Sequence, residues 1–259
     1  GTGTVNGAAY NTAVGYKALE DITSGDANVA LGMYACSSML TGLGNIAIGA
    51  YDGTTAGPMR LSTAASNCIA VGTGSLAAIA TSDADGTIAI GYKSLNAITS
   101  GQSNVGIGST TLQGAMNAAD YNTAVGFQAG KNVTTADQNT LIGLSAGYNL
   151  TTGGTNTMIG AETGYNSVDV DRTVMIGKNA GFTNMTADAD GTVSIGYDSG
   201  RTVSDGQYNT HVGYKSGSEN NGDKNTALGY GSFTDTLASL QNDSNTAIGR
   251  FLGRTAGEV

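Results

Sequence analysis

The sequence predicts an all-β fold, a repetitive β-solenoid (β-roll) of about 14 coils. Three observations predict it. A short apolar segment that ends in glycine recurs fourteen times, all but one of the steps between these glycines are 16 to 20 residues long, and 259 residues include 41 glycines, one proline and no tryptophan. Residues 1–259 are therefore expected to form a single repeat domain, with coils marked by Gly15, Gly32, Gly49, Gly72, Gly91, Gly108, Gly126, Gly143, Gly160, Gly177, Gly196, Gly213, Gly229 and Gly249.

Each coil is expected to contribute one short strand immediately before its glycine. The residue three before the glycine is β-branched in all fourteen coils, and the residue one before it is aliphatic in all fourteen. Two such positions separated by one residue have the period of a strand. The predicted strands are 12–14, 29–31, 46–48, 69–71, 88–90, 105–107, 123–125, 140–142, 157–159, 174–176, 193–195, 210–212, 226–228 and 246–248.

The middle residue of each predicted strand should point to the opposite face, and it is not polar as a solvent-facing strand would require. It is alanine in eight coils, for example Ala30 and Ala247, and Met158 or Met175 in others. We expect the flanking residues to fill the coil and this small-residue face to close against another chain. The pattern therefore predicts an oligomer, and we expect a homotrimer because a single coil buries little apolar surface.

The rest of the coil follows the same repeat. Ten coils carry asparagine four before the glycine, which predicts a ladder of side-chain amides along the stack. The glycine is expected at a corner with positive φ or a close backbone approach. An apolar residue such as Ile22 or Val133 lies seven or eight positions after the glycine and precedes a turn.

The charge balance limits the binding partners of the chain, and the positions of its two cysteines limit its disulfide bonds. The chain has 20 acidic and 11 basic residues, so no basic cluster is present for nucleic acid, and no apolar stretch long enough for membrane insertion occurs. Cys36 and Cys68 lie two coils apart, beyond disulfide reach, and are expected to be free and buried. The chain begins at Gly1 rather than methionine, and we expect it to be a segment of a longer protein.

The amino-acid pattern of the repeat resembles the repeats of two related protein families. Asn-Thr-Ala-Val-Gly-Tyr-Lys-Ala-Leu at 11–19, Asn-Thr-Ala-Val-Gly-Phe-Gln-Ala-Gly at 122–130 and Asn-Thr-Ala-Leu-Gly-Tyr at 225–230 resemble the repeats of phage tail fibres and, with a shorter coil, the head repeats of trimeric autotransporter adhesins. The resemblance covers residues 10–253 and implies homotrimeric β-rolls that serve in surface attachment. The 17-residue coil favours the fibre, which implies a virion location, with a bacterial cell surface as the alternative.

Receptor contacts, if this segment makes them, are expected in loops that depart from the repeat. The step from Gly49 to Gly72 contains an insertion at 53–66, with candidate contacts at Thr54, Thr55, Pro58, Arg60 and Ser62. A tolerated insertion without function is the alternative. The long turn at 231–244 offers Phe233 and Asp235. The receptor would be a cell-surface glycan or protein.

Metal and cofactor signals are weak. Asp83 and Asp85, like Asp188 and Asp190, form Asp-Ala-Asp-Gly turns that resemble the start of a calcium loop but lack its distal glutamate. His211 replaces alanine on the expected inter-chain face, where three copies could meet an ion. Plain turns and a packed histidine explain these residues as well, and no cofactor is expected.

The residue types present do not predict a catalytic site. The four glutamates do not share a repeat position, and one histidine with two buried cysteines offers no nucleophile and base pair. We therefore expect a non-enzymatic structural protein of a virion tail fibre that contributes to host attachment. A bacterial trimeric adhesin head and a polysaccharide-cleaving tailspike are the alternatives. Tyrosines after the glycine could stack on sugars or simply pack, and ice binding is disfavoured because the threonines alternate irregularly and are expected to face inward.

Overall fold

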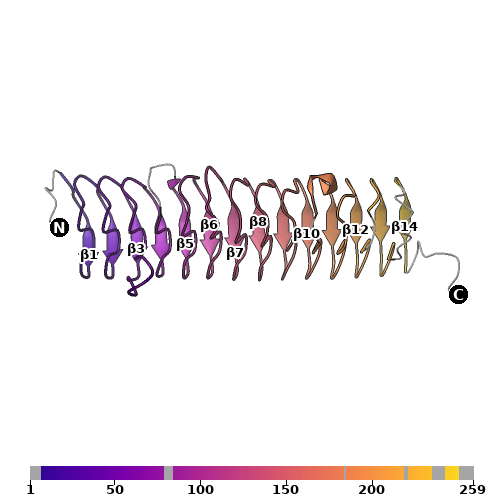
Figure 1. Ribbon diagram of the computed structural model, residues 1–259, viewed down its shortest axis with the longest axis horizontal. Coiled ribbons are helices and arrows are strands. Elements are labelled where there is room, and N and C mark those ends of the chain that lie inside the picture. The colour runs from indigo at the N-terminus through magenta and orange to yellow at the C-terminus, as the bar shows by residue number, and fades with distance from the viewer. Residues whose placement is uncertain (1–6, 79–83, 184, 219–220, 235–242, 251–259) are drawn as a thin grey trace. The chain divides into compact units, whose positions relative to one another are not determined.

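The computed structural model is an all-β solenoid of 14 parallel strands, and it describes residues 7–78, 84–183, 185–218, 221–234 and 243–250 (Figure 1). Each strand is three residues long and ends immediately before a coil glycine, as the repeat predicts. A short 3-10 helix, η2 (Ala187–Ala189), lies in the turn before β11. The strands are β1 (Thr12–Val14), β2 (Val29–Leu31), β3 (Ile46–Ile48), β4 (Ile69–Val71), β5 (Ile88–Ile90), β6 (Val105–Ile107), β7 (Thr123–Val125), β8 (Thr140–Ile142), β9 (Thr157–Ile159), β10 (Val174–Ile176), β11 (Val193–Ile195), β12 (Thr210–Val212), β13 (Thr226–Leu228) and β14 (Thr246–Ile248).

The chain divides into two compact units, residues 1–135 with β1 to β7 and residues 136–259 with β8 to β14. Within each unit consecutive strands pair in parallel and in register. Met158 is the register partner of Met175, and Ser194 is the register partner of His211. Equivalent positions of successive coils therefore form rows along the stack.

The middle residues of the strands form an inner row, which points into the coil. From β2 to β14 this residue is buried, and most members of the row are fully inaccessible to solvent. The residues on either side of it form two outer rows that are half-buried or exposed. The sequence-based assignment of the two faces is therefore wrong: the small residues fill the coil, and the β-branched and aliphatic residues face outward.

The reason is a size match between the inner row and the residue four after the coil glycine, which faces it across the coil. Ala89 and Gly106 are small, and Leu95 and Leu112 at the matching positions are large and fully buried. Where the inner row carries Leu141, Met158 or Met175, the matching residue is Gly147, Gly164 or Gly181, and a Cβ there would meet the facing side chain. In these coils one of the two matched positions carries a large side chain and the other a small one, because protein interiors are close-packed.

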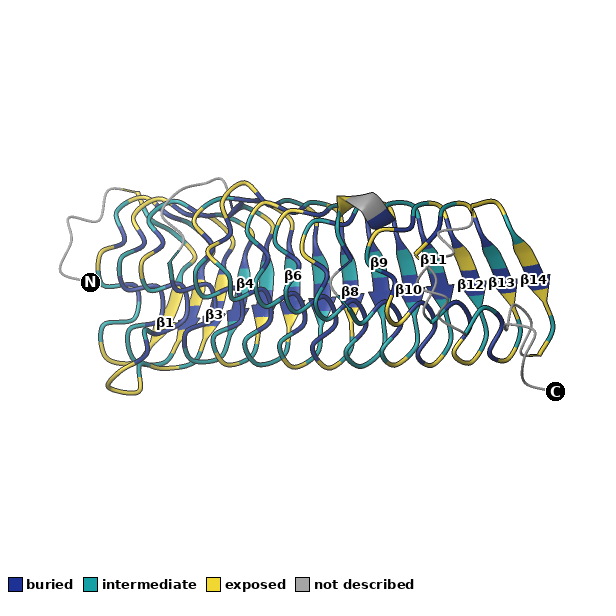
Figure 2. Cartoon of the chain, turned by 45° about the vertical axis from the view of Figure 1, so that its right-hand side comes forward, coloured by how far each residue is buried: buried dark blue, intermediate teal, exposed yellow. Residues whose placement is uncertain are grey.

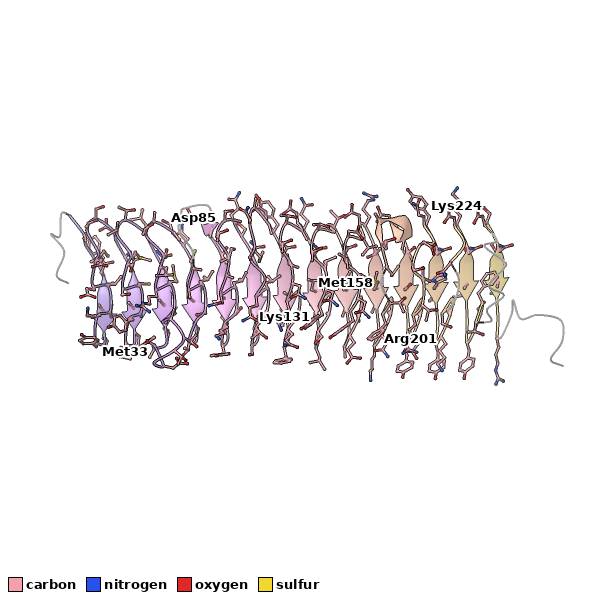
Figure 3. All side chains as sticks on the ribbon, viewed as in Figure 1. Met33, Asp85, Lys131, Met158, Arg201 and Lys224 are labelled. Carbon is pink, nitrogen blue, oxygen red and sulfur yellow. The ribbon has the colours of Figure 1, made fainter. Side chains whose placement is uncertain are left out.

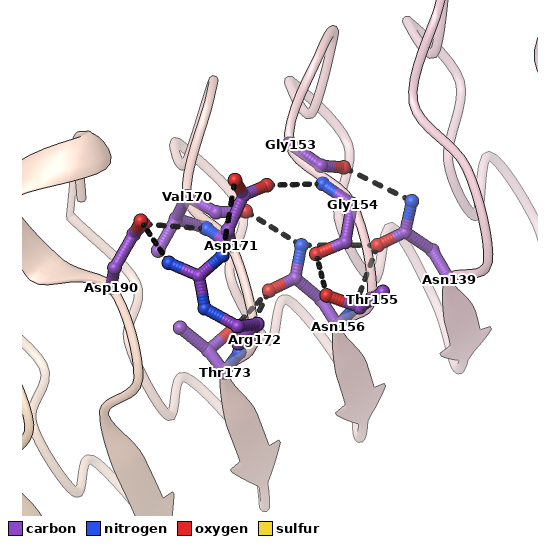
Figure 4. A network of polar contacts seen from close by, with 10 residues as sticks. All are labelled: Asn139, Gly153, Gly154, Thr155, Asn156, Val170, Asp171, Arg172, Thr173 and Asp190. Atoms are coloured by element: carbon purple, nitrogen blue, oxygen red, sulfur yellow. Dashed lines mark hydrogen bonds and ion pairs between the residues drawn. The ribbon is translucent and has the colours of Figure 1, made fainter.

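The asparagine ladder and the glycine corner are confirmed. Nδ2 of Asn156 donates to Oδ1 of Asn139 at 3.0 Å, and Asn28 and Asn45 repeat the contact at 2.9 Å (Figure 4 shows the first pair). The coil glycines have φ between 118° and 142°. At Gly160 a Cβ would lie 2.6 Å from the carbonyl oxygen of Gly177, so only glycine allows this spacing of successive corners.

Candidate functional site

The two outer rows form a continuous apolar face on the strands of each unit. The row one before the glycine contains only valine, leucine and isoleucine, and the row three before it contains threonine, valine and isoleucine. Figure 2 shows the buried middle residue between more exposed neighbours, as in β12 and β14. Exposed fractions reach 36% to 61% at Val14, Val29, Leu31, Ile46, Ile48, Ile90, Ile107, Ile142, Leu228 and Ile248. Large contiguous apolar patches on soluble proteins mark interaction sites, so we take this outer face as a candidate assembly surface.

The threonines of this face point outward, contrary to the expectation that they face the coil interior. Thr12 and Thr246 are exposed, and Thr140 and Thr157 are half-exposed. The row nevertheless alternates irregularly with valine and isoleucine, and the neighbouring row is wholly aliphatic. The face is therefore apolar in character rather than a regular array of hydroxyl groups.

Aromatic side chains form short ladders at the ends of the strands. The rings of Tyr197, Tyr214 and Tyr230 stack with centroid distances of 5.3 and 4.9 Å and interplanar angles of 8° and 10°. Each shared ring face is therefore covered by the next ring, and what solvent reaches is mainly the ring edges and hydroxyl groups. A sugar has little free ring face to stack on within such a ladder, which favours the packing role that the sequence left open.

The insertion after β3 is a compact loop with its own hydrogen bonds. Oδ1 of Asp52 accepts hydrogen bonds from the backbone N–H of Thr54 at 2.9 Å and of Thr55 at 2.6 Å, and from the Thr54 hydroxyl at 3.0 Å. These hydrogen bonds lower the pKa of Asp52 to about 2. The Tyr51 hydroxyl donates to the carbonyl of Gly53 at 2.7 Å. These hydrogen bonds therefore hold the loop in a defined conformation on the surface.

The extra residues end well before the end of the range 53–66 predicted from the sequence. The backbone N–H of Tyr51 and the carbonyl of Ala56 both make regular contacts with adjacent coils, so the six residues beyond the regular 17-residue step lie between Ala50 and Gly57. From Pro58 onward the chain has resumed the coil, since the carbonyl of Pro58 accepts from the N–H of Cys36 as a regular turn does. Sequence spacing fixes the length of an insertion but not its place within the step.

The candidate receptor contacts differ in their exposure to solvent. Thr54 is exposed and Arg60 is half-exposed, with its guanidinium 5.1 Å from the ring centroid of Tyr34. Thr55 and Pro58 are buried, and Ser62 lies fully buried in the coil interior, so a receptor cannot reach Ser62 without unfolding the coil. In the long turn near the C-terminal end of the described chain, Phe233 is half-buried, while Asp235 lies outside the described residues.

The aspartates of the Asp-Ala-Asp-Gly turns act as inter-coil caps. Oδ1 of Asp85 accepts from the N–H of Ser66 at 2.6 Å, and Oδ1 of Asp190 accepts from the N–H of Asp171 at 2.7 Å. Burial is the main cause that raises the pKa of Asp190. Asp83 and the side chain of Asp188 lie outside what the structure describes, and among the described residues no group of three potential ligands surrounds a metal site.

Sequence reasoning missed that this cap is a row of the repeat. Aspartate occurs six residues before the coil glycine in eight coils, and its Oδ1 accepts a backbone N–H of the preceding coil at 2.6 to 2.9 Å, as at Asp26, Asp120 and Asp223. Aligning the coils on their glycines was enough to find it. The eight residues are Asp26, Asp85, Asp120, Asp137, Asp171, Asp190, Asp223 and Asp243.

His211 does not lie on an inter-chain face. It belongs to the inner row of β12, is fully buried, and occupies the space that Gly217 leaves on the opposite side of the coil. Neither ring nitrogen has a hydrogen-bond partner among the described residues, and neither does the Oγ of the adjacent Ser194. Burial lowers the pKa of His211 to about 4, so the ring is neutral at pH 7.

Both cysteines are free and buried, as predicted. Burial raises the pKa of Cys36 to about 12 and that of Cys68 to about 11, which leaves the unreactive thiol form at neutral pH.

Comparison with protein-family models, with curated proteins and with solved structures finds no match to this chain. Within the described part of the chain, no helix has the length and hydropathy needed to cross a bilayer.

Proposed function

We propose that this chain is a non-enzymatic structural segment of a virion tail fibre that assembles as a homotrimer and contributes to attachment to the host cell. The observation that carries the proposal is the exposed apolar outer face, which repeats at every coil of both units. Packing the outer faces of three copies around a common axis removes these aliphatic rows from water without altering any coil. A bacterial trimeric adhesin head is the alternative, and it would use the same face in the same way.

The assembly is tested by charge on the outer face. Ile107 and Ile142 are each 37% exposed and each ends a regular strand. We expect the native chain to run as a trimer in light scattering, and Ile107→Asp with Ile142→Asp to yield a folded monomer, because three carboxylates per level would face one another. A native monomer at micromolar concentration contradicts the proposal.

Attachment is tested at the inserted loop. Deleting residues 50–55 restores the 17-residue step while keeping Ala56 and Gly57 at regular coil positions. We expect the melting temperature of this variant to stay within a few degrees of the native value, and adsorption to host cells to be lost. Retained adsorption would place receptor binding elsewhere in the parent fibre and make this segment a shaft.

The non-enzymatic assignment is tested against a polysaccharide-cleaving tailspike. Incubation with host capsule or lipopolysaccharide, followed by assay for new reducing ends, should give no turnover. Sustained release of reducing ends would show that the segment cleaves glycans and would overturn the assignment.

A further inference from the structure

Charged residues are segregated to the two sides of the outer face. We define the start edge as the residues six and five before each coil glycine, where the strands begin, and the end edge as the residues one to five after it, where the chain leaves the strand. In Figure 3 Lys224 lies on the side where the strands begin and Arg201 on the side where they end. The two edges run along the stack on either side of the aliphatic rows.

The start edge is acidic in both units. In residues 136–259 it contains five acidic and two basic residues, a net charge of −3, and in residues 1–135 it contains three acidic and no basic residues, again −3. The carboxylates are fixed in place because their Oδ1 atoms cap the preceding coil, as at Asp171, Asp190 and Asp243. The edge is therefore a row of oriented negative charges.

The end edge is basic in both units. In residues 1–135 it contains three basic and two acidic residues, a net charge of +1, and the described part of residues 136–259 contains four basic and two acidic residues, a net charge of +2. Lys178, Lys215, Arg201 and Arg250 are exposed in the second unit, and the last three lie over aromatic rings at 5.5 to 5.6 Å. This contact restricts the long side chains and holds the positive charges beside the outer face.

The apolar face alone does not set the direction in which copies associate, because hydrophobic burial is non-directional and every coil presents the same rows. The edges do. In an assembly whose rotation axis runs along the stack, all copies point the same way and the start edge of one copy adjoins the end edge of the next. In an antiparallel pair related by an axis along the strands, start edge meets start edge and like charges face each other.

We infer that the acidic start edge and the basic end edge select a second copy of this chain in parallel orientation and reject the antiparallel one. This inference rests on the proposed assembly through the outer face and adds what gives that assembly its polarity. A fibre segment needs such polarity, because every chain must present the same end toward the particle.

Two lysines provide a matched test. Lys215 lies on the end edge and Lys224 on the start edge, both are exposed, and both have left-handed backbones with φ of 51° and 58°. Each Lys→Glu change alters the net charge of the full-length chain equally. At about 25 mM salt we expect Lys215→Glu to raise the concentration for half-assembly by about tenfold and Lys224→Glu to leave it unchanged or lower it, with the difference much reduced at about 500 mM salt. Equal effects of the two changes would overturn the inference.

Orientation is read by energy transfer between labelled copies. Tyr10 is 90% exposed and precedes β1, and the native cysteines are buried, so Tyr10→Cys accepts a maleimide dye selectively. Mixed donor-labelled and acceptor-labelled chains should show efficient transfer, since only a parallel assembly brings this residue to the same level in each copy. An assembly without transfer contradicts the parallel orientation but leaves the outer-face assembly standing. A monomer at both salt concentrations refutes both.

Discussion

Replacing Asn156 by alanine should destabilise the coils around β9 and β10 by several kcal/mol. Asn156 is 1% exposed and links three coils (Figure 4). Its Nδ2 donates to Oδ1 of Asn139 at 3.0 Å and to the carbonyl of Val170 at 2.6 Å, while its Oδ1 accepts from the backbone N–H of Thr173 at 2.9 Å and from the Thr173 hydroxyl at 2.7 Å. Truncation removes all four contacts.

The magnitude follows from the groups left behind. The Asn156 backbone N–H still donates to Oδ1 of Asn139 at 3.0 Å, so that acceptor keeps a partner. Three groups lose the side-chain partners described above: the carbonyl of Val170, the N–H of Thr173 and the Thr173 hydroxyl. The hydroxyl can rotate, whereas the two backbone groups are fixed in direction, so only these two are counted. A buried polar group without a partner costs about 1 to 3 kcal/mol, so two such groups predict a loss of about 4 kcal/mol.

The assay is hydrogen exchange of the backbone amides in 157–176, because in a repeat array the loss is confined largely to the altered coil and its neighbours. A loss of about 4 kcal/mol corresponds to exchange about three orders of magnitude faster. Asn11→Ala is the matched control: it removes an equivalent ladder residue that is half-exposed in the first described coil, where water can replace the contacts, and should cost about 1 kcal/mol. If Asn156→Ala changed protection by less than tenfold, the ladder would not stabilise the stack.

Three further predictions concern the coil interior and its corner. Burial lowers the pKa of His211 to about 4, while the unfolded imidazole titrates near 6.5. The unfolded state therefore binds an extra proton as the pH falls from 6.5 to 4, and the unfolding free energy should fall by about 3 kcal/mol over that window. Urea unfolding at several pH values should show this decrease, and His211→Leu should remove it. Met158→Asp should unfold its coil rather than merely dissociate chains, with loss of β-sheet signal in circular dichroism, whereas Ile142→Asp keeps that signal. Gly160→Ala should lower the melting temperature by more than 5 °C, since its Cβ would lie 2.6 Å from the carbonyl oxygen of Gly177, and an unchanged melting curve would contradict the close approach of the corners.

The sequence by itself determined the repeat and everything that follows from its period. Fourteen glycines fixed the number and bounds of the strands, because each strand must end where the corner requires positive φ. One equivalent strand in every coil favoured pairing of successive strands in register, and recurring asparagine fixed the amide ladder. These are local properties of one coil, repeated at each level, so no knowledge of distant contacts was needed.

Only the tertiary structure decided which face of the strand lies inside. A period of two separates two faces but does not order them when both are apolar, and the order depends on what lies across the coil. The size match of Met158 with Gly164 and of Leu141 with Gly147 held that information in the sequence, but reading it required knowing that these positions face each other. His211 is buried for the same reason, because it belongs to the inner row that faces the coil interior. A repeat specifies its own coil through neighbours in sequence, whereas the inside and outside of that coil are set by side chains that meet only after the chain has turned back on itself.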